Sequence, residues 1–283
     1  MNEPYQPLRQ MNTIEILKQA ISLYRQNFLK LLGVILPGIP VVIFCILILS
    51  LILNEFFVTI LSAPMPKAGE MPKGDVYKKI VPIMMLIFFL MYFFSTIVAA
   101  AGTIVISEFF LGREIKIADA YRKIWKRIFP LLGAIILTSV ITGLITILGM
   151  FLCIIPGIIG WVYLSAWFGF IAQIVMLEGE GGMGAMKCSR TLIKEDSRKS
   201  LIVIGSVMAV TLIAWIFLIV GNVMATQFNM VILTPIGNLL SISALILIEP
   251  IKFTAITLLY YDLRIRREGF DLKILEEELS AEI

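Results

Sequence analysis

Long apolar runs alternate with short polar segments along the whole chain. Runs of about 20 residues, which is the length that a helix needs to cross a bilayer, lie at about 31–53, 80–106, 131–152, 158–177, 201–225 and 236–261. No ten-residue segments alternate in the way that a membrane barrel requires. The pattern therefore predicts an all-α, polytopic helical bundle with six transmembrane helices.

Two of the polar segments have the periodicity of an amphipathic helix that lies on a membrane surface. The apolar positions of the segment 14–28 recur with the same spacing in the segment 113–128, 100 positions later. The first set is Leu17, Ile21, Tyr24 and Phe28, and the second set is Ile117, Tyr121, Ile124 and Ile128. A third polar segment, 184–199, has a less regular apolar face. In this alignment Gly205 corresponds to Gly33 and Gly133.

These elements predict one membrane domain over 1–283, built from three hairpins that each follow a surface helix. The predicted repeats are 12–106, 113–178 and 184–262. The break Ile155-Pro156-Gly157 is expected to reverse the chain between the third and fourth spans. Proline and glycine in 54–79 predict an irregular external loop, and 263–283 is a cytoplasmic tail.

The distribution of basic residues predicts the orientation. Of the 24 lysines and arginines, four lie in the 54–79 loop, and the remaining 20 lie in segments that the six spans place on the opposite side. Because positive charge gathers on the cytoplasmic side, both termini are expected in the cytoplasm. The chain is then a multi-pass protein of the plasma or inner membrane.

Composition weighs against an enzyme. Hydrophobic residues form 59% of the chain, and it has no histidine, the commonest general base and metal ligand. Its three cysteines do not form a zinc-binding spacing. We expect no catalytic residues, no metal and no cofactor. The expected partners are the bilayer, with anionic lipids or other membrane proteins, and not nucleic acid.

The last predicted span contains two ionisable residues, Glu249 and Lys252, on either side of Pro250. Their i, i+3 spacing puts both on one helical face, where they can neutralise each other. Pro250 is expected to bend or break the helix. Pro37 and Pro40 interrupt the first span, and we hypothesise that both weak points surround a polar pocket. A purely structural ion pair is the alternative.

The second surface helix carries four basic residues beside aromatic ones. Arg122, Lys123, Lys126 and Arg127 accompany Tyr121 and Trp125. This mixture suits anionic lipid headgroups. The rule that cytoplasmic segments are basic accounts for the same charges without specific recognition.

Two stretches resemble a known family. They are MLEGEGGMGAMKCSRTLI at 176–193 and LLYYDLRIRREGFDL at 258–272, and they are similar to the segments that close the fourth and sixth spans in the glycerophosphoryl diester phosphodiesterase membrane-domain family. The resemblance implies a prokaryotic six-span membrane protein. The family takes its name from chains in which this region is joined to a catalytic barrel. The histidines of such a barrel are absent from this sequence.

Two classes of function compete on this evidence. The first is a non-enzymatic membrane protein that packs with partners or lipids. The second is a transporter or channel for a small solute or lipid, which would use a polar pocket near Glu249 and Lys252.

Overall fold

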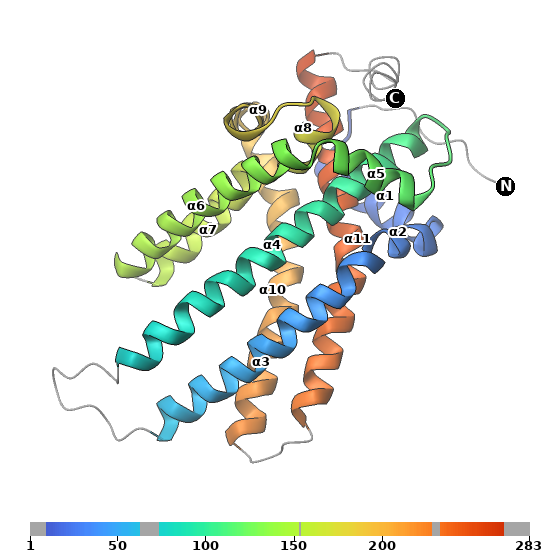
Figure 1. Ribbon diagram of the computed structural model, residues 1–283. Coiled ribbons are helices and arrows are strands. Elements are labelled where there is room, and N and C mark those ends of the chain that lie inside the picture. Colours follow the sequence, from blue (N-terminus) through green and yellow to red (C-terminus); the bar gives the residue numbers. More distant parts are fainter. Residues whose placement is uncertain (1–9, 63–73, 153, 228–232, 269–283) are drawn as a thin grey trace. The chain divides into compact units, whose positions relative to one another are not determined.

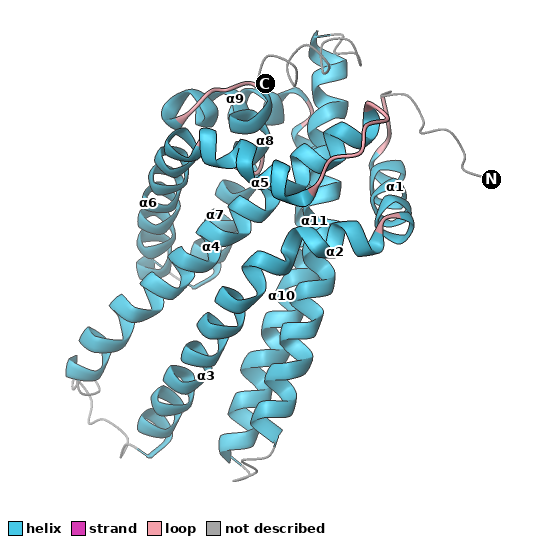
Figure 2. Cartoon of the chain, turned by 45° about the vertical axis from the view of Figure 1, so that its right-hand side comes forward, coloured by secondary structure: helices cyan, strands magenta, loops and turns pink. Residues whose placement is uncertain are grey.

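The computed structural model describes residues 10–62, 74–152, 154–227 and 233–268 (Figure 1). Every regular element within these residues is a helix (Figure 2), which confirms the all-α prediction. In chain order they are α1 (Thr13–Gln26), α2 (Phe28–Ile35), the 3-10 turn η1 (Leu36–Gly38), α3 (Ile39–Ser62), α4 (Gly74–Phe110), α5 (Ile117–Lys126), α6 (Ile128–Leu152), α7 (Ile154–Trp167), α8 (Ile171–Leu177), α9 (Gly182–Glu195), α10 (Ser197–Gln227) and α11 (Leu233–Glu268).

Six stretches of these helices are long and apolar enough to cross a membrane. They are Phe28–Ile52, Met85–Phe110, Ile128–Thr146, Ile159–Leu177, Ser197–Gly221 and Ile242–Arg267. Each overlaps one of the six predicted spans, so the prediction of a polytopic helical membrane protein is confirmed.

The predicted 54–79 loop is too long. Helix α3 continues to Ser62 and α4 starts at Gly74, so only 63–73 falls outside the described residues. The prolines and glycines of this region lie between 64 and 74. The flanking residues contain none of them and therefore extend the adjacent helices.

The chain forms two compact units, each made of segments from different parts of the sequence. Unit 1 comprises 1–35, 96–208 and 249–283, and unit 2 comprises 36–95 and 209–248. The boundaries of the units cut across the three predicted repeats. The division into repeats therefore stays a prediction about the sequence.

The second half of α11 is the core of unit 1. Apart from Ile256, its residues from Phe253 to Arg264 are buried, so this part of the helix is covered on all sides. Gly102 of α4 packs against the ring of Phe253, where a larger residue would collide with it. The helix thus brings its polar side chains into the interior of the unit.

Three elbows surround this core, each a surface helix that breaks at one residue and continues as a spanning helix. Elbow 1 is α1–α2 (13–35), elbow 2 is α5 with the start of α6 (117–135), and elbow 3 is α9 with the start of α10 (182–204). The breaks fall at Asn27, Arg127 and Asp196. In each elbow the residue four positions later donates its N–H to the carbonyl of the break residue, at 2.9, 3.1 and 3.0 Å.

The three elbows share one register of burial. The residue seven positions before each break is Ala20, Ala120 or Ser189, and all three are fully buried. The residue four positions after each break is Leu31, Leu131 or Ser200, and these are buried as well. Gly33 lies six positions after its break, and the residue six positions after Asp196 is Ile202, so the prediction that Gly205 corresponds to Gly33 is wrong by three residues. The sequence alignment of elbow 3 fails because small and polar residues of α9 take positions that are apolar in the other elbows.

The third and fourth spans form a tight hairpin. Helix α7 begins at Ile154, so Pro156 and Gly157 lie in its first turn, and the prediction that they reverse the chain is wrong. Proline is tolerated there because a first-turn N–H has no helical partner. A Cβ on Gly149 of α6 would lie 2.8 Å from the Cα of Gly157. These glycines let the two backbones approach each other.

Unit 2 has an apolar core of its own. Cys45 and Leu49 of α3 are buried with Ile87 of α4. Ile46 of α3 is buried with Ile242 of α11, and Trp215 of α10 packs against both groups.

Candidate functional site

The predicted ion pair in the sixth span forms. Lys252 Nζ lies 2.6 Å from Glu249 Oε1, and about one fifth of each side chain is exposed. The predicted break does not occur, since α11 continues through the buried Pro250. Thr254 donates its hydroxyl to the carbonyl of Pro250 at 2.7 Å, so this carbonyl has a side-chain hydrogen bond.

Pro37 and Pro40 interrupt the first span as predicted. Pro37 lies in η1, and Pro40 is the second residue of α3. Both prolines are exposed and belong to unit 2, whereas Glu249 belongs to unit 1. A shared polar pocket around these residues stays a prediction.

A polar layer joins α4, α8 and α11 inside unit 1. The Thr103 and Thr257 hydroxyl oxygens are 3.2 Å apart, and Gln173 Nε2 donates to Thr257 Oγ1 at 3.4 Å. Ser107 and Tyr261 bond to each other one turn further along. The carbonyl oxygen Oε1 of Gln173 is buried without a hydrogen-bond partner. Such a group is costly in an interior, so this layer is an unusual feature of the core of the unit.

The fourth span is broken beside this layer. The sequence predicts one helix over 158–177, but α7 ends at Trp167 and α8 starts at Ile171. Ser189 of α9 donates to the carbonyl of Trp167 at 2.7 Å and accepts the N–H of Phe170 at 3.4 Å. A side chain from another helix thus satisfies the backbone groups that the break exposes, as membrane interiors require.

The carboxyl end of α8 is also capped from outside its own helix. Arg127 donates through one guanidinium nitrogen to the carbonyls of Val175 and Met176 at 2.9 and 3.1 Å. Cations are favoured at helix carboxyl ends. Arg127 therefore connects elbow 2 to the buried α8.

The stretches 176–193 and 258–272 meet at Glu178 and Tyr260. Tyr260 donates its phenol to Glu178 at 2.7 Å, and Cys188 donates to the other oxygen of Glu178 at 3.2 Å. Arg264 donates to the Tyr260 oxygen at 3.1 Å. These four side chains form one bonded group that joins the two stretches.

A second buried group fixes the start of elbow 1. Asp262 is fully buried and accepts from the backbone N–H of Met11, from Lys199 Nζ and from Arg266 Nε. Lys199 and Arg266 both donate to the carbonyl of Met11 as well. Buried charges need this kind of complete pairing. The N-terminal segment is thereby held against α10 and α11.

The four predicted headgroup contacts divide into two kinds. Lys123 lies 3.1 Å from Glu108 in a largely buried pair, and Arg127 caps α8. These two side chains are engaged inside the protein. Arg122 and Lys126 are exposed, so only these two have the accessibility that the prediction needs.

Sequence reasoning missed most of these groups. The pairing of Asp262 with Lys199 and that of Glu178 with Tyr260 are not predicted from the sequence. Their pairing joins residues 63 and 82 positions apart, and the periodicity of one helix carries no information about such partners. The polar identity of Asp262 between apolar neighbours was the available signal.

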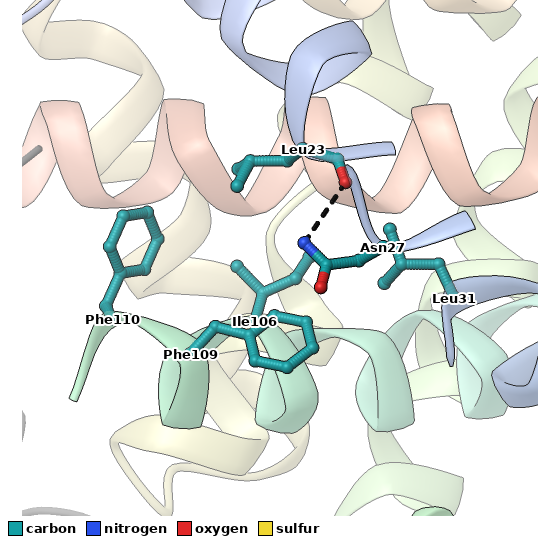
Figure 3. A pocket seen from close by; sticks show the side chains of 6 residues that line it. All are labelled: Leu23, Asn27, Leu31, Ile106, Phe109 and Phe110. Atoms are coloured by element: carbon teal, nitrogen blue, oxygen red, sulfur yellow. Dashed lines mark hydrogen bonds between the residues drawn. The ribbon is translucent and has the colours of Figure 1, made fainter. Parts of the chain in front are cut away.

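A small cavity lies between elbow 1 and α4 in unit 1. Figure 3 shows a cavity lined by Leu23, Asn27, Leu31, Ile106, Phe109 and Phe110. Its volume is about 10 Å³, on the order of one water molecule. No group of three or more metal-binding side chains gathers among the residues that the structure describes.

Comparison with known proteins adds no family. No family model matches the chain, and no curated protein or solved structure matches it either.

Proposed function

We propose that this chain is a non-enzymatic membrane protein that acts by packing with lipids or with other membrane proteins. The observation that supports it is the outer surface of elbow 2. Trp125 and Phe129 are 68% and 80% exposed, and the basic Arg122 and Lys126 are exposed near them. Aromatic and basic side chains together favour the boundary between headgroups and acyl chains.

The proposed setting is the inner or plasma membrane of a prokaryote, with both termini in the cytoplasm. The asymmetry of the basic residues supports this orientation. Single cysteines at Gly69 and Gly182, in a chain without native cysteines, test it by labelling intact cells with an impermeant maleimide. We expect labelling at position 69 only. Labelling at position 182 alone would overturn the topology.

Lipid contact at elbow 2 is tested by the fluorescence of Trp125 in a chain whose other tryptophans are phenylalanine. In bilayers of brominated lipid we expect strong quenching, because the indole reaches the upper acyl chains. The emission of an indole in water, with no quenching by brominated lipid, would contradict the proposal.

We also propose that the chain resembles the membrane region of the glycerophosphoryl diester phosphodiesterase membrane-domain family but has no phosphodiesterase activity. The absence of histidine supports this. The purified protein should release no glycerol phosphate from glycerophosphodiesters. Metal-dependent release that disappears in Glu178→Gln would refute the non-enzymatic part of the proposal.

A transporter is the second candidate, favoured by the broken fourth span and the buried, unpartnered Oε1 of Gln173. Discontinuous helices and polar groups at membrane depth are typical of transport sites. A further ionisable pair, Glu249 and Lys252, lies in the sixth span.

A double-mutant cycle separates a structural pair from a transport site. Glu249→Gln and Lys252→Met should each destabilise the protein in detergent, and the double variant should lose less than their sum. A double variant that is stable but has lost a solute flux seen in the wild type would favour transport. A stable variant without any phenotype would favour the structural pair.

A further inference from the structure

The outer face of α9 in elbow 3 concentrates positive charge. Met183, Lys187, Arg190 and Lys194 are all exposed, and their spacing places them within about 60° on one side of the helix. The opposite side is buried through Ala185, Ser189, Leu192 and Ile193. Glu195, also exposed, is the acidic residue beside Lys194. This face therefore carries three cations in a row after one apolar residue.

Arg190 differs from its two lysine neighbours because it is stacked. Its guanidinium carbon lies 4.5 Å from the centre of the Trp167 ring. Trp167 in turn lies 4.7 Å from the ring of Tyr163, which is 44% exposed. This contact restrains the guanidinium, while the Arg190 side chain stays exposed. An arginine held in this way can bind a phosphate with two parallel hydrogen bonds.

Two hydrogen bonds hold α9 beside this stack. Ser189, next to Arg190, bonds to the carbonyl of Trp167 and to the N–H of Phe170. These two bonds hold α9 against the end of α7, at the break in the fourth span. Tyr163 and Trp167 lie in the last two turns of α7. Aromatic side chains of this kind favour the headgroup level of a bilayer, which would bring Arg190 close to lipid phosphates.

We propose that Lys187, Arg190 and Lys194 form a binding site for the headgroup phosphate of an anionic phospholipid. In this site Arg190, supported by Trp167, binds the phosphate directly. The two lysines lie one turn away on each side and add attraction for a net negative headgroup. This inference rests on the proposed function, because it assumes that the surface helices lie against lipid, and it adds a class of lipid and a location.

The other elbows offer a matched control. In the shared register, Arg25 of elbow 1 occupies the position of Lys194, and Ile21 occupies the position of Arg190. Arg25 is exposed like Arg190, but it is not among the cations that lie over an aromatic ring in the described residues. Arg25→Gln therefore removes the same charge as Arg190→Gln without affecting a stacked guanidinium.

The test is native mass spectrometry of the full chain titrated with dioleoylphosphatidylglycerol or dioleoylphosphatidylcholine. We expect the wild type to retain one phosphatidylglycerol preferentially. Arg190→Gln should weaken this binding about tenfold, as the loss of one charge-assisted hydrogen bond predicts. Arg25→Gln should change it less than twofold, and Arg190→Lys should fall between them. Thermal unfolding curves check that each variant is folded.

Four outcomes would contradict the proposals in different ways. Equal losses in Arg190→Gln and Arg25→Gln would overturn the site and leave general attraction of charge. Equal retention of both lipids by the wild type would overturn the headgroup class while leaving lipid packing intact. Retention of neither lipid would count against the proposed function itself. Competition by millimolar glycerol phosphate as strong as by lipid would assign the site to a free phosphate.

Discussion

Elbows 1 and 2 have the same backbone but are fixed at different places. Both break four residues before a buried leucine, Leu31 or Leu131, and both bury an alanine seven residues before the break. Elbow 1 is held at its start, where Met11 is bonded to Asp262 and Lys199. Elbow 2 is held at its break, where Arg127 caps α8. The repeated apolar pattern therefore specifies the shape of each elbow, whereas individual polar residues specify where the elbow is attached to the rest of unit 1.

The break residues show the same division. Asn27 donates its side-chain amide to Leu23 of its own helix at 3.4 Å, a bond visible in Figure 3. Asp196 accepts from the N–H of Lys199 in the next helix at 3.1 Å. Arg127 bonds to α8, which is not part of its own elbow. The long side chain of Arg127 therefore makes a tertiary contact from the break of elbow 2 to the carboxyl end of α8.

Asp262→Asn is expected to have the largest effect, because it leaves the buried Lys199 without its carboxylate. Removing one partner of a buried ion pair costs about 3–5 kcal/mol. Thermal unfolding in detergent measures the loss, and hydrogen exchange should show faster exchange in α1 than in α5. Glu114→Gln, which removes an exposed partner of Lys30, is the control and should leave unfolding unchanged. Equal exchange in both helices would contradict separate attachment.

Arg127→Met should have the next largest effect. It removes two bonds to carbonyls of α8, and one charge-assisted group of this kind contributes about 1.5–3 kcal/mol. Hydrogen exchange should rise in α5 and α8 and stay unchanged in α1. The matched variant Asn27→Leu should cost less than half as much, since the bond that it removes is an uncharged one to the Leu23 carbonyl of the same elbow. A larger effect of Asn27→Leu would reverse the comparison.

Tyr121→Phe should have the smallest effect, about 1 kcal/mol for one hydrogen bond. Tyr121 of elbow 2 donates to the carbonyl of Val34 in elbow 1 at 2.6 Å and so links the two elbows. Burial raises the pKa of Tyr121 from 10.0 to about 12.

The raised pKa predicts a dependence on pH. The unfolded chain ionises first, so the contribution of Tyr121 is present below pH 10 and is lost as the pH rises through about 12. The difference in stability between wild type and Tyr121→Phe should therefore shrink over this range. A difference that is constant from pH 9 to 12 would show that the hydroxyl is not held as described.

Much of the fold follows from periodicity, because a membrane span and an amphipathic helix each impose a pattern on consecutive residues. The six spans and the first two surface helices are therefore readable in sequence. Elbow 3 is harder to align, since Ser189 and Ser200 take positions that are apolar in the others. The break at 168–170 is hidden because its partner, Ser189, lies in another helix. The spacing of Glu249 and Lys252 predicts their pairing, whereas Asp262 and Lys199 pair across the fold.

The most direct test of the account measures the depth of Leu29 and Phe129, which are 79% and 80% exposed and occupy equivalent positions in elbows 1 and 2. Spin labels at these positions, one at a time in a chain without native cysteines, would be compared for collisions with oxygen and with a water-soluble nickel complex. The account predicts that both labels lie in the acyl region just below the headgroups and at similar depths. Free access of the nickel complex to both labels would contradict it.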